Sequence, residues 1–119
     1  MNRVLIIEDE AQIRQNFLEI LELEGFEAYG AENGEIGLDV IDHNQLDLVI
    51  CDLLMPGMDG AEVLRAVRET PHTEYLPFIV VTANTDLGRR DEVLNIGATA
   101  VLTKPVDLDV LLDAIRESI

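Results

Sequence analysis

The chain has 119 residues and a net charge of −16, with 24 acidic residues against 8 basic ones. This length fits a single domain. The 48% of hydrophobic residues can fill one core, which must be largely aliphatic because only 4% are aromatic. So negative a chain is unsuited to nucleic acid or to an anionic membrane surface, since both require clusters of Lys and Arg. One cysteine cannot form an internal disulfide, and no apolar stretch could span a bilayer, so we expect a cytoplasmic protein.

Short apolar runs alternate with helical patterns along the chain. The runs, which predict buried strands, lie at residues 4–7, 27–31 (the weakest), 48–51, 78–81 and 100–102. After the first run, apolar residues recur at helical spacing from Ile13 to Leu21, and Gly25 follows as a helix stop. Further helices are expected around residues 36–41, 63–67, 93–96 and 108–115, the third and fifth helices having the N-caps Asp59 and Asp107.

Five apolar strands alternating with five helices indicate a parallel sheet that is covered by helices on both faces. The predicted fold class is therefore α/β, with one (βα)5 domain over residues 1–119. In an open sheet of this kind, ligands bind beyond the carboxyl ends of the strands, at the switch in strand order. The residues that follow each strand are therefore the candidates for function.

Polar residues follow four of the predicted strands. Glu8 and Asp9 follow the first, Asp52 the third and Thr82 the fourth, and Lys104, the only lysine in the chain, comes after the fifth. Carboxylates this close raise each other's pKa unless a cation lies among them, and oxygen ligands suit Mg²⁺. Asp52 could act as a nucleophile that forms an aspartyl-phosphate. Mg²⁺ and Lys104 would neutralise the phosphoryl group, and Thr82 could donate a hydrogen bond to it.

Each of these residues also has a simpler interpretation. The acidic run could be solvated and lie at the positive end of the first helix; it comprises Glu8, Asp9 and Glu10. We prefer this interpretation for Glu10. Thr82 could cap the following turn, and the Lys-Pro pair at 104–105 could be an ordinary turn. Separately these interpretations are acceptable. Together they leave unexplained why three carboxylates, a hydroxyl and the only lysine converge on one edge.

Four motifs together resemble the receiver domain of two-component response regulators. They are I-I-E-D-E at 6–10, D-L-L-M-P-G-M-D-G at 52–60, V-V-T-A at 80–83 and G-A-T-A-V-L-T-K-P at 97–105. The resemblance covers essentially the whole chain, and the order and spacing of the motifs make it specific. It implies a flavodoxin-like three-layer sandwich, in which the five-stranded parallel sheet has the strand order 2-1-3-4-5.

The resemblance implies that Asp52 accepts a phosphoryl group from a sensor histidine kinase or a phosphotransfer protein. The implied ligands of Mg²⁺ are two acidic side chains, the phosphoacceptor and one backbone carbonyl: Glu8, Asp9, Asp52 and Leu54. Thr82 would be the switch hydroxyl, and Lys104 would contact the phosphoryl group. Cofactor binding is also assigned to the residues that directly follow Asp52 and Thr82, which are Leu53 and Ala83. The domain is expected to be a phosphoacceptor rather than an enzyme, although it assists its own phosphorylation and dephosphorylation.

The chain departs from the family pattern at several positions. Val101 occupies a position that is often Tyr or Phe and is too short to make the family's aromatic rotation on activation, so we expect the change to lie in residues 83–90. Glu8 replaces the commoner Asp, which should preserve metal binding. Leu54 is apolar and cannot orient an attacking water. The family also implies a cis peptide bond between Lys104 and Pro105.

Three other classes of protein are alternatives. A haloacid-dehalogenase-like phosphatase also uses a strand-end Asp, but it needs a second acid at position 54, where Leu54 stands. A flavodoxin needs a phosphate-binding Ser/Thr/Gly loop after the first strand, where this chain has E-D-E. A receiver that is not phosphorylated and serves only as a docking module is the third. The expected partners are the kinase or phosphotransfer protein and an output domain or effector protein, and homodimerisation is possible.

Overall fold

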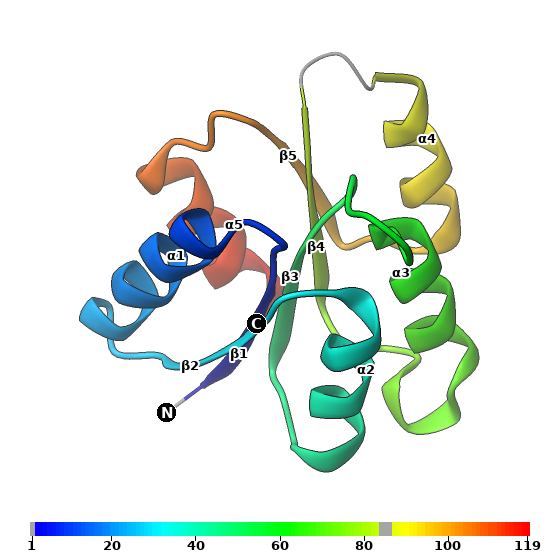
Figure 1. Cartoon of the computed structure of the whole chain (residues 1–119), viewed down its shortest axis with the longest axis horizontal. Coiled ribbons are helices and arrows are strands. Elements are labelled where there is room, and N and C mark those ends of the chain that lie inside the picture. Colours follow the sequence, from blue (N-terminus) through cyan, green and yellow to red (C-terminus); the bar gives the residue numbers. More distant parts are fainter. Residues whose placement is uncertain (1, 84–86) are drawn as a thin grey trace.

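The computed structural model describes residues 2–83 and 87–119. Its strands and helices alternate along the chain (Figure 1). The strands are β1 (Arg3–Ile7), β2 (Glu27–Ala31), β3 (Leu48–Asp52), β4 (Phe78–Thr82) and β5 (Ala100–Thr103). The helices are α1 (Ala11–Leu23), α2 (Gly34–His43), α3 (Gly60–Glu69), the short 3₁₀ helix η1 (Pro71–Thr73), α4 (Leu87–Ile96) and α5 (Leu108–Ser118).

The sheet is parallel throughout, and its strands lie in the order β2-β1-β3-β4-β5. This confirms the predicted flavodoxin-like fold. Helices α1 and α5 lie on one face of the sheet, and α2, α3 and α4 lie on the other (Figure 1). The order changes direction at β1 and β3, which are neighbours although they are not consecutive in sequence. The carboxyl ends of these two strands therefore mark the position where a ligand is expected.

The core has two parts, one on each face of the sheet. Successive residues of a strand point to opposite faces, so Leu5 and Ile7 pack beneath α2–α4 while Val4 and Ile6 pack beneath α1 and α5. Strands β3 and β4 are buried along their whole length. The continuous apolar runs in the sequence follow from this burial on both faces.

The helix ends agree with the predicted signals. After α1, Gly25 has a φ of 89°, and the N–H of Phe26 donates to the carbonyl of Leu21 at 3.0 Å, which closes the helix. Asp59 caps α3 in a reciprocal capping box with Glu62. The Asp107 side chain likewise accepts a hydrogen bond at the start of α5.

Some boundaries differ from the prediction. Strands β3, β4 and β5 each run one residue further, so that Asp52 and Thr82 are the last residues of their strands rather than the first residues of a loop. Asp52 pairs with Val81, and Thr82 pairs with Thr103. Their backbones are therefore fixed by the sheet. Helix η1 was not predicted, because a single 3₁₀ turn is too short to show a hydrophobic period.

One peptide bond and the lengths of the helices bear on the remaining expectations. The Lys104–Pro105 peptide bond is cis, which confirms the expectation from the family resemblance. Within residues 2–83 and 87–119, every helix is too short or too polar to cross a membrane.

Candidate functional site

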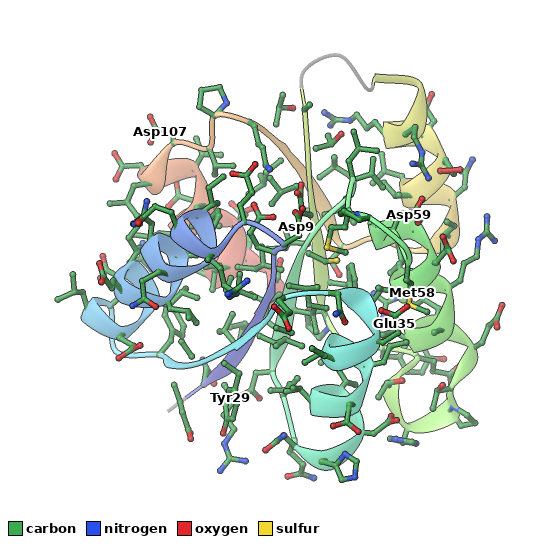
Figure 2. The ribbon with its side chains drawn as sticks, viewed as in Figure 1. Asp9, Tyr29, Glu35, Met58, Asp59 and Asp107 are labelled. Carbon is green, nitrogen blue, oxygen red and sulfur yellow. The ribbon has the colours of Figure 1, made fainter. Side chains whose placement is uncertain are left out.

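The acidic residues that end or follow β1 and β3 form one cluster. One carboxylate oxygen from each of Glu8, Asp9 and Asp52 lies within 4.8 Å of the other two. Figure 2 shows Asp9 and Asp59 on the side of the sheet to which the strands' carboxyl ends point. Glu8 and Asp52 are buried and Asp9 is exposed. Of these three residues, Asp9 is therefore the one that gives solvent access to the cluster.

Lys104 reaches this cluster from the segment between β5 and α5. Its Nζ lies 3.1 Å from Oδ2 of Asp52 and 3.5 Å from Oε1 of Glu8. Its backbone N–H donates to the carbonyl of Thr82 at 2.8 Å, which anchors the residue to the end of β4. Partial burial acts to lower the pKa of Lys104, but the charges and hydrogen bonds of Asp52 and Glu8 outweigh it, so its pKa is raised. The ammonium group is therefore charged at neutral pH.

Glu8 is in the least favourable environment of the three acids. Its residue surface is 3% exposed, and among the described residues its Oε2 has no hydrogen-bond partner. Burial first, and then the charge of Asp52, raise the pKa of Glu8 to about 7, although Lys104 acts in the opposite direction. A buried carboxylate oxygen without a partner is costly. A cation bound beside it would supply the missing interaction.

The donor set fits Mg²⁺. Three carboxylates provide oxygen ligands on one side, and the exposed side at Asp9 leaves positions for water or for phosphate oxygens. Leu54, which was expected to offer its carbonyl, lies in the loop after β3 with 51% of its surface exposed. An exposed apolar residue at this position is consistent with a role for its backbone rather than for its side chain.

The two residues assigned to cofactor binding lie beside the cluster. Leu53 directly follows Asp52 and is fully buried. Its N–H donates to the carbonyl of Val81 at 2.8 Å, and its carbonyl accepts from the N–H of Gly60 at 2.9 Å. Ala83 follows Thr82 and is half-buried. Leu53 therefore extends the pairing between β3 and β4 beyond Asp52.

Thr82 is the last residue of β4, and β4 is the neighbour of β3, which ends at Asp52. It is 3% exposed, and its Oγ1 donates to the carbonyl of Ala83 across a long 3.4 Å. This weak, local hydrogen bond leaves the hydroxyl able to exchange its partner for a better acceptor. The residues that follow Ala83, which are 84–86, lie outside the described residues.

Residues that sequence reasoning missed lie around the site. A Cβ on Gly60 would lie 2.5 Å from the carbonyl oxygen of Asp52 and 2.9 Å from Cα of Leu53, so the start of α3 packs directly on the backbone of Asp52. Arg89 of α4 donates to the Asp59 carboxylate at 3.0 Å. Arg14 of α1 donates to the carbonyl of Glu8 at 2.8 Å. The only signal in the sequence was the glycine after the Asp59 N-cap.

The comparison with known families agrees with this geometry. Residues 4–116 match the model of the response regulator receiver domain. The chain belongs to this family. It is therefore a receiver domain of the two-component response regulators, and the phosphatase and flavodoxin alternatives no longer apply.

Individual relatives support the assignment. Sporulation initiation phosphotransferase F of Bacillus subtilis (strain 168) is 33% identical over 115 residues, which cover 97% of this chain and 91% of the relative. Response regulator MprA of Mycobacterium sp. (strain KMS) is 35% identical over 114 residues, which cover 96% of this chain and 49% of the relative. The chain thus spans nearly all of the first relative and about half of the second.

Solved structures give the same result. The crystal structure of a response regulator receiver domain protein from Clostridium thermocellum superimposes with a TM-score of 0.94 at 32% identity. The match covers 100% of this chain and 94% of that chain.

Proposed function

We propose that the domain is switched by phosphorylation of Asp52. The single observation that carries this proposal is the contact of Asp52 with Lys104, at 3.1 Å, inside a cluster that also holds Glu8 and Asp9. An oxygen of the Asp52 carboxylate attacks phosphorus, an O–P bond forms, and the P–N bond to the imidazole of the donor breaks. The electron pair of that bond remains on the imidazole nitrogen.

The other residues of the site bind and orient the phosphoryl group. Lys104 would form an ion pair with a phosphoryl oxygen, and the Thr82 hydroxyl would exchange its 3.4 Å contact with Ala83 for a phosphoryl oxygen. Mg²⁺ held by Glu8, Asp9, Asp52 and the carbonyl of Leu54 would offset the negative charge that gathers during the transfer. Leu53 and Ala83 are the further candidates for contacts with the bound group. With these residues, the domain would assist its own phosphorylation and dephosphorylation.

The proposed partners follow from this chemistry. The phosphoryl donor is a sensor histidine kinase or a phosphotransfer protein, and the phosphorylated surface is read by an output domain or an effector protein. A homodimer is a further candidate assembly. We also propose that residues 1–119 form one receiver domain that works in the cytoplasm.

Phosphorylation can be tested with a small donor. The protein is incubated with acetyl phosphate and Mg²⁺, and intact mass is followed for the addition of one phosphoryl group. We expect labelling of the wild type, none of Asp52→Asn, and full labelling of Asp91→Asn, which removes an exposed acid of α4. EDTA should suppress the labelling.

Two outcomes would contradict the proposal. Equal labelling of Asp52→Asn would place the phosphoryl group on another residue. If the wild type stays unlabelled with acetyl phosphate and also with a histidine kinase, the domain is a docking module that is not phosphorylated.

A further inference from the structure

Arg14 links helix α1 to the end of strand β1. Its Nη1 donates a hydrogen bond to the carbonyl oxygen of Glu8 at 2.8 Å, and the side chain is half-buried. On the other side of the same residue, the Glu8 N–H donates to the carbonyl of Ala31 at 3.0 Å. The paired residues of β1 end at Ile7, opposite Ala31 and Cys51. Arg14 therefore supplies a partner to a carbonyl that extends past the last pair of the sheet.

This hydrogen bond fixes more than Glu8. The Glu8 carbonyl belongs to the peptide unit that joins Glu8 to Asp9, and a peptide unit is planar. Holding the carbonyl oxygen fixes the rotation of this plane about the line that joins the two Cα atoms, and this restricts ψ of Glu8 and φ of Asp9, on which the directions of the two side chains depend. Within the described residues, the side chain of Glu10, the N-cap of α1, makes no capping hydrogen bond. The arginine is therefore a principal anchor of the turn that carries both acids.

The arginine side chain is itself held in place. A Cβ on Gly30 of β2 would lie 3.4 Å from Cδ and 3.6 Å from Cγ of Arg14, and 3.1 Å from Cδ1 of Leu18. The aliphatic part of Arg14 thus lies against the bare backbone of β2, which a side chain at position 30 would crowd. The hydrogen bond from a guanidinium to a carbonyl is charge-assisted and is therefore stronger than one between neutral groups.

We propose that Arg14 is a positioning residue for the divalent cation. It holds the Glu8–Asp9 peptide in the orientation in which both carboxylates face one ion. The inference rests on the proposed function, because it assumes that Mg²⁺ binds at this cluster.

The charge of Arg14 and its hydrogen bond should change the Mg²⁺ affinity in opposite directions. A positive charge beside a cation site opposes cation binding, so removing it should tighten the binding of Mg²⁺ if charge alone mattered. Loss of the hydrogen bond should weaken the binding, because the two acids would no longer be held together before the ion arrives. A weaker affinity in a variant that lacks the charge therefore identifies the positioning role.

The test is a titration of the metal-free protein with MgCl₂ at constant ionic strength, followed by backbone amide shifts. We expect Arg14→Met to bind Mg²⁺ roughly 10-fold more weakly than wild type. Arg14→Lys keeps the charge and can still donate a hydrogen bond, but from a differently shaped group, so its Mg²⁺ affinity should lie between those of Arg14→Met and the wild type. The control is Arg65→Met, which removes an exposed arginine of α3 and should leave the affinity unchanged or slightly tighter. At limiting Mg²⁺, labelling of Arg14→Met by acetyl phosphate should be slow, and the deficit should shrink as Mg²⁺ is raised.

Each outcome decides the question. An affinity of Arg14→Met equal to or tighter than that of wild type overturns the proposal, even if the variant melts at a lower temperature, since a purely structural role lowers stability without changing metal affinity. If Arg14→Met does not fold, Arg14→Lys decides alone, and an unchanged affinity overturns the proposal. A wild type that binds no Mg²⁺ refutes the metal site and this inference together. A wild type that binds while Arg14→Met binds equally well refutes only the inference.

Discussion

Glu8 is the carboxyl group of the site whose pKa is raised. Burial and the Asp52 charge raise its pKa to about 7, from an ordinary value of 4.5. In the metal-free protein, the folded state therefore holds a proton that the unfolded state releases between these two values. Below pH 4.5, Glu8 is protonated in both the folded and the unfolded state. Above about pH 7, Glu8 is ionised in both states, and the folded state carries the full cost of the buried charge.

This gives a prediction for stability against pH. In EDTA, the free energy of unfolding should fall as the pH rises from about 4.5 to about 7, and Glu8→Gln should lack this fall. Above pH 7 the variant should be more stable than wild type by on the order of 2 kcal/mol. Urea unfolding at pH 5 and pH 8 provides the measurement. Glu10→Gln, the same change at an exposed neighbour, is the control. The raised pKa of His43 contributes equally to each protein and cancels. Parallel pH profiles for wild type and Glu8→Gln would contradict the assignment.

At the scale of the elements, the start of α3 packs directly against the backbone of Asp52. Gly60 leaves no room for a side chain against the Asp52 carbonyl, and its N–H donates to the carbonyl of Leu53. Asp59, one residue earlier, caps α3 and accepts a hydrogen bond from Arg89 of α4. A change at Asp52 therefore has a short physical path through α3 to the start of α4.

Two glycine substitutions test how tightly α3 is packed on β3. Gly60→Ala should destabilise the domain by about 1–3 kcal/mol, because the new Cβ would force the helix away from the Asp52 backbone. Gly88→Ala is the matched control. Among the described residues, nothing lies within 4 Å of a Cβ at this helical position. The control should be neutral or stabilising by up to about 1 kcal/mol. Denaturant unfolding measures both variants, and equal effects would show that the close contact at Gly60 is unimportant.

Val101 and the segment 83–90 give a prediction for where phosphorylation changes the structure. Val101 is partly buried against the core beneath α2–α4, and its β-branched side chain is short and has a restricted χ1. We therefore expect beryllofluoride with Mg²⁺ to shift the backbone amides of residues 83–90 more than those of Val101 and α5. Residues 84–86 of this segment lie outside the described residues. Arg89→Gln removes the charged bond to Asp59 and should reduce the shifts at the start of α4. Shifts centred on Val101, with residues 83–90 unchanged, would disprove this mechanism.

At the scale of the whole molecule, the fold followed from patterns that are local in sequence, but the site did not follow from them entirely. Short continuous apolar runs and apolar residues at helical spacing predicted the ten main elements, and the identity of Asp52 as a strand-end carboxylate was visible in the sequence. The meeting of Asp52 with Lys104 depends on the strand order, which came from the family resemblance and not from any local pattern.

The remaining features could not be predicted because they depend on packing. Glu8 is buried beside Asp52 and Lys104, both far away in sequence, and its Oε2 has no hydrogen-bond partner among the described residues. Long flexible side chains are equally hard to place in advance. Arg14 bonds the carbonyl of Glu8, which directly follows β1, and Arg89 bonds a residue 30 positions away. Spacing in the sequence does not distinguish these two arginines from the exposed Arg65.

The large negative charge of the molecule separates general screening from specific metal binding. A net charge of −16 on a domain of this size destabilises the folded state by repulsion, so added NaCl should raise the melting temperature. MgCl₂ at the same ionic strength should raise it further in the wild type, because the ion binds the folded state alone. At ten times the dissociation constant, binding adds about 1.4 kcal/mol, which corresponds to roughly 4–8 °C for a domain of this length.

The additional rise in melting temperature that MgCl₂ gives over NaCl, here called the excess, should depend on the acidic cluster. Asp52→Asn relieves repulsion with Glu8, so we expect it to melt higher than wild type without metal but to lose most of the excess. Asp91→Asn removes one exposed charge from α4 and should keep the full excess, so it controls for net charge. Differential scanning calorimetry in EDTA, NaCl and MgCl₂ measures all three proteins. If the excess persisted undiminished in Asp52→Asn, Mg²⁺ would be acting on the diffuse charge of the surface, and the cluster would not be its binding site.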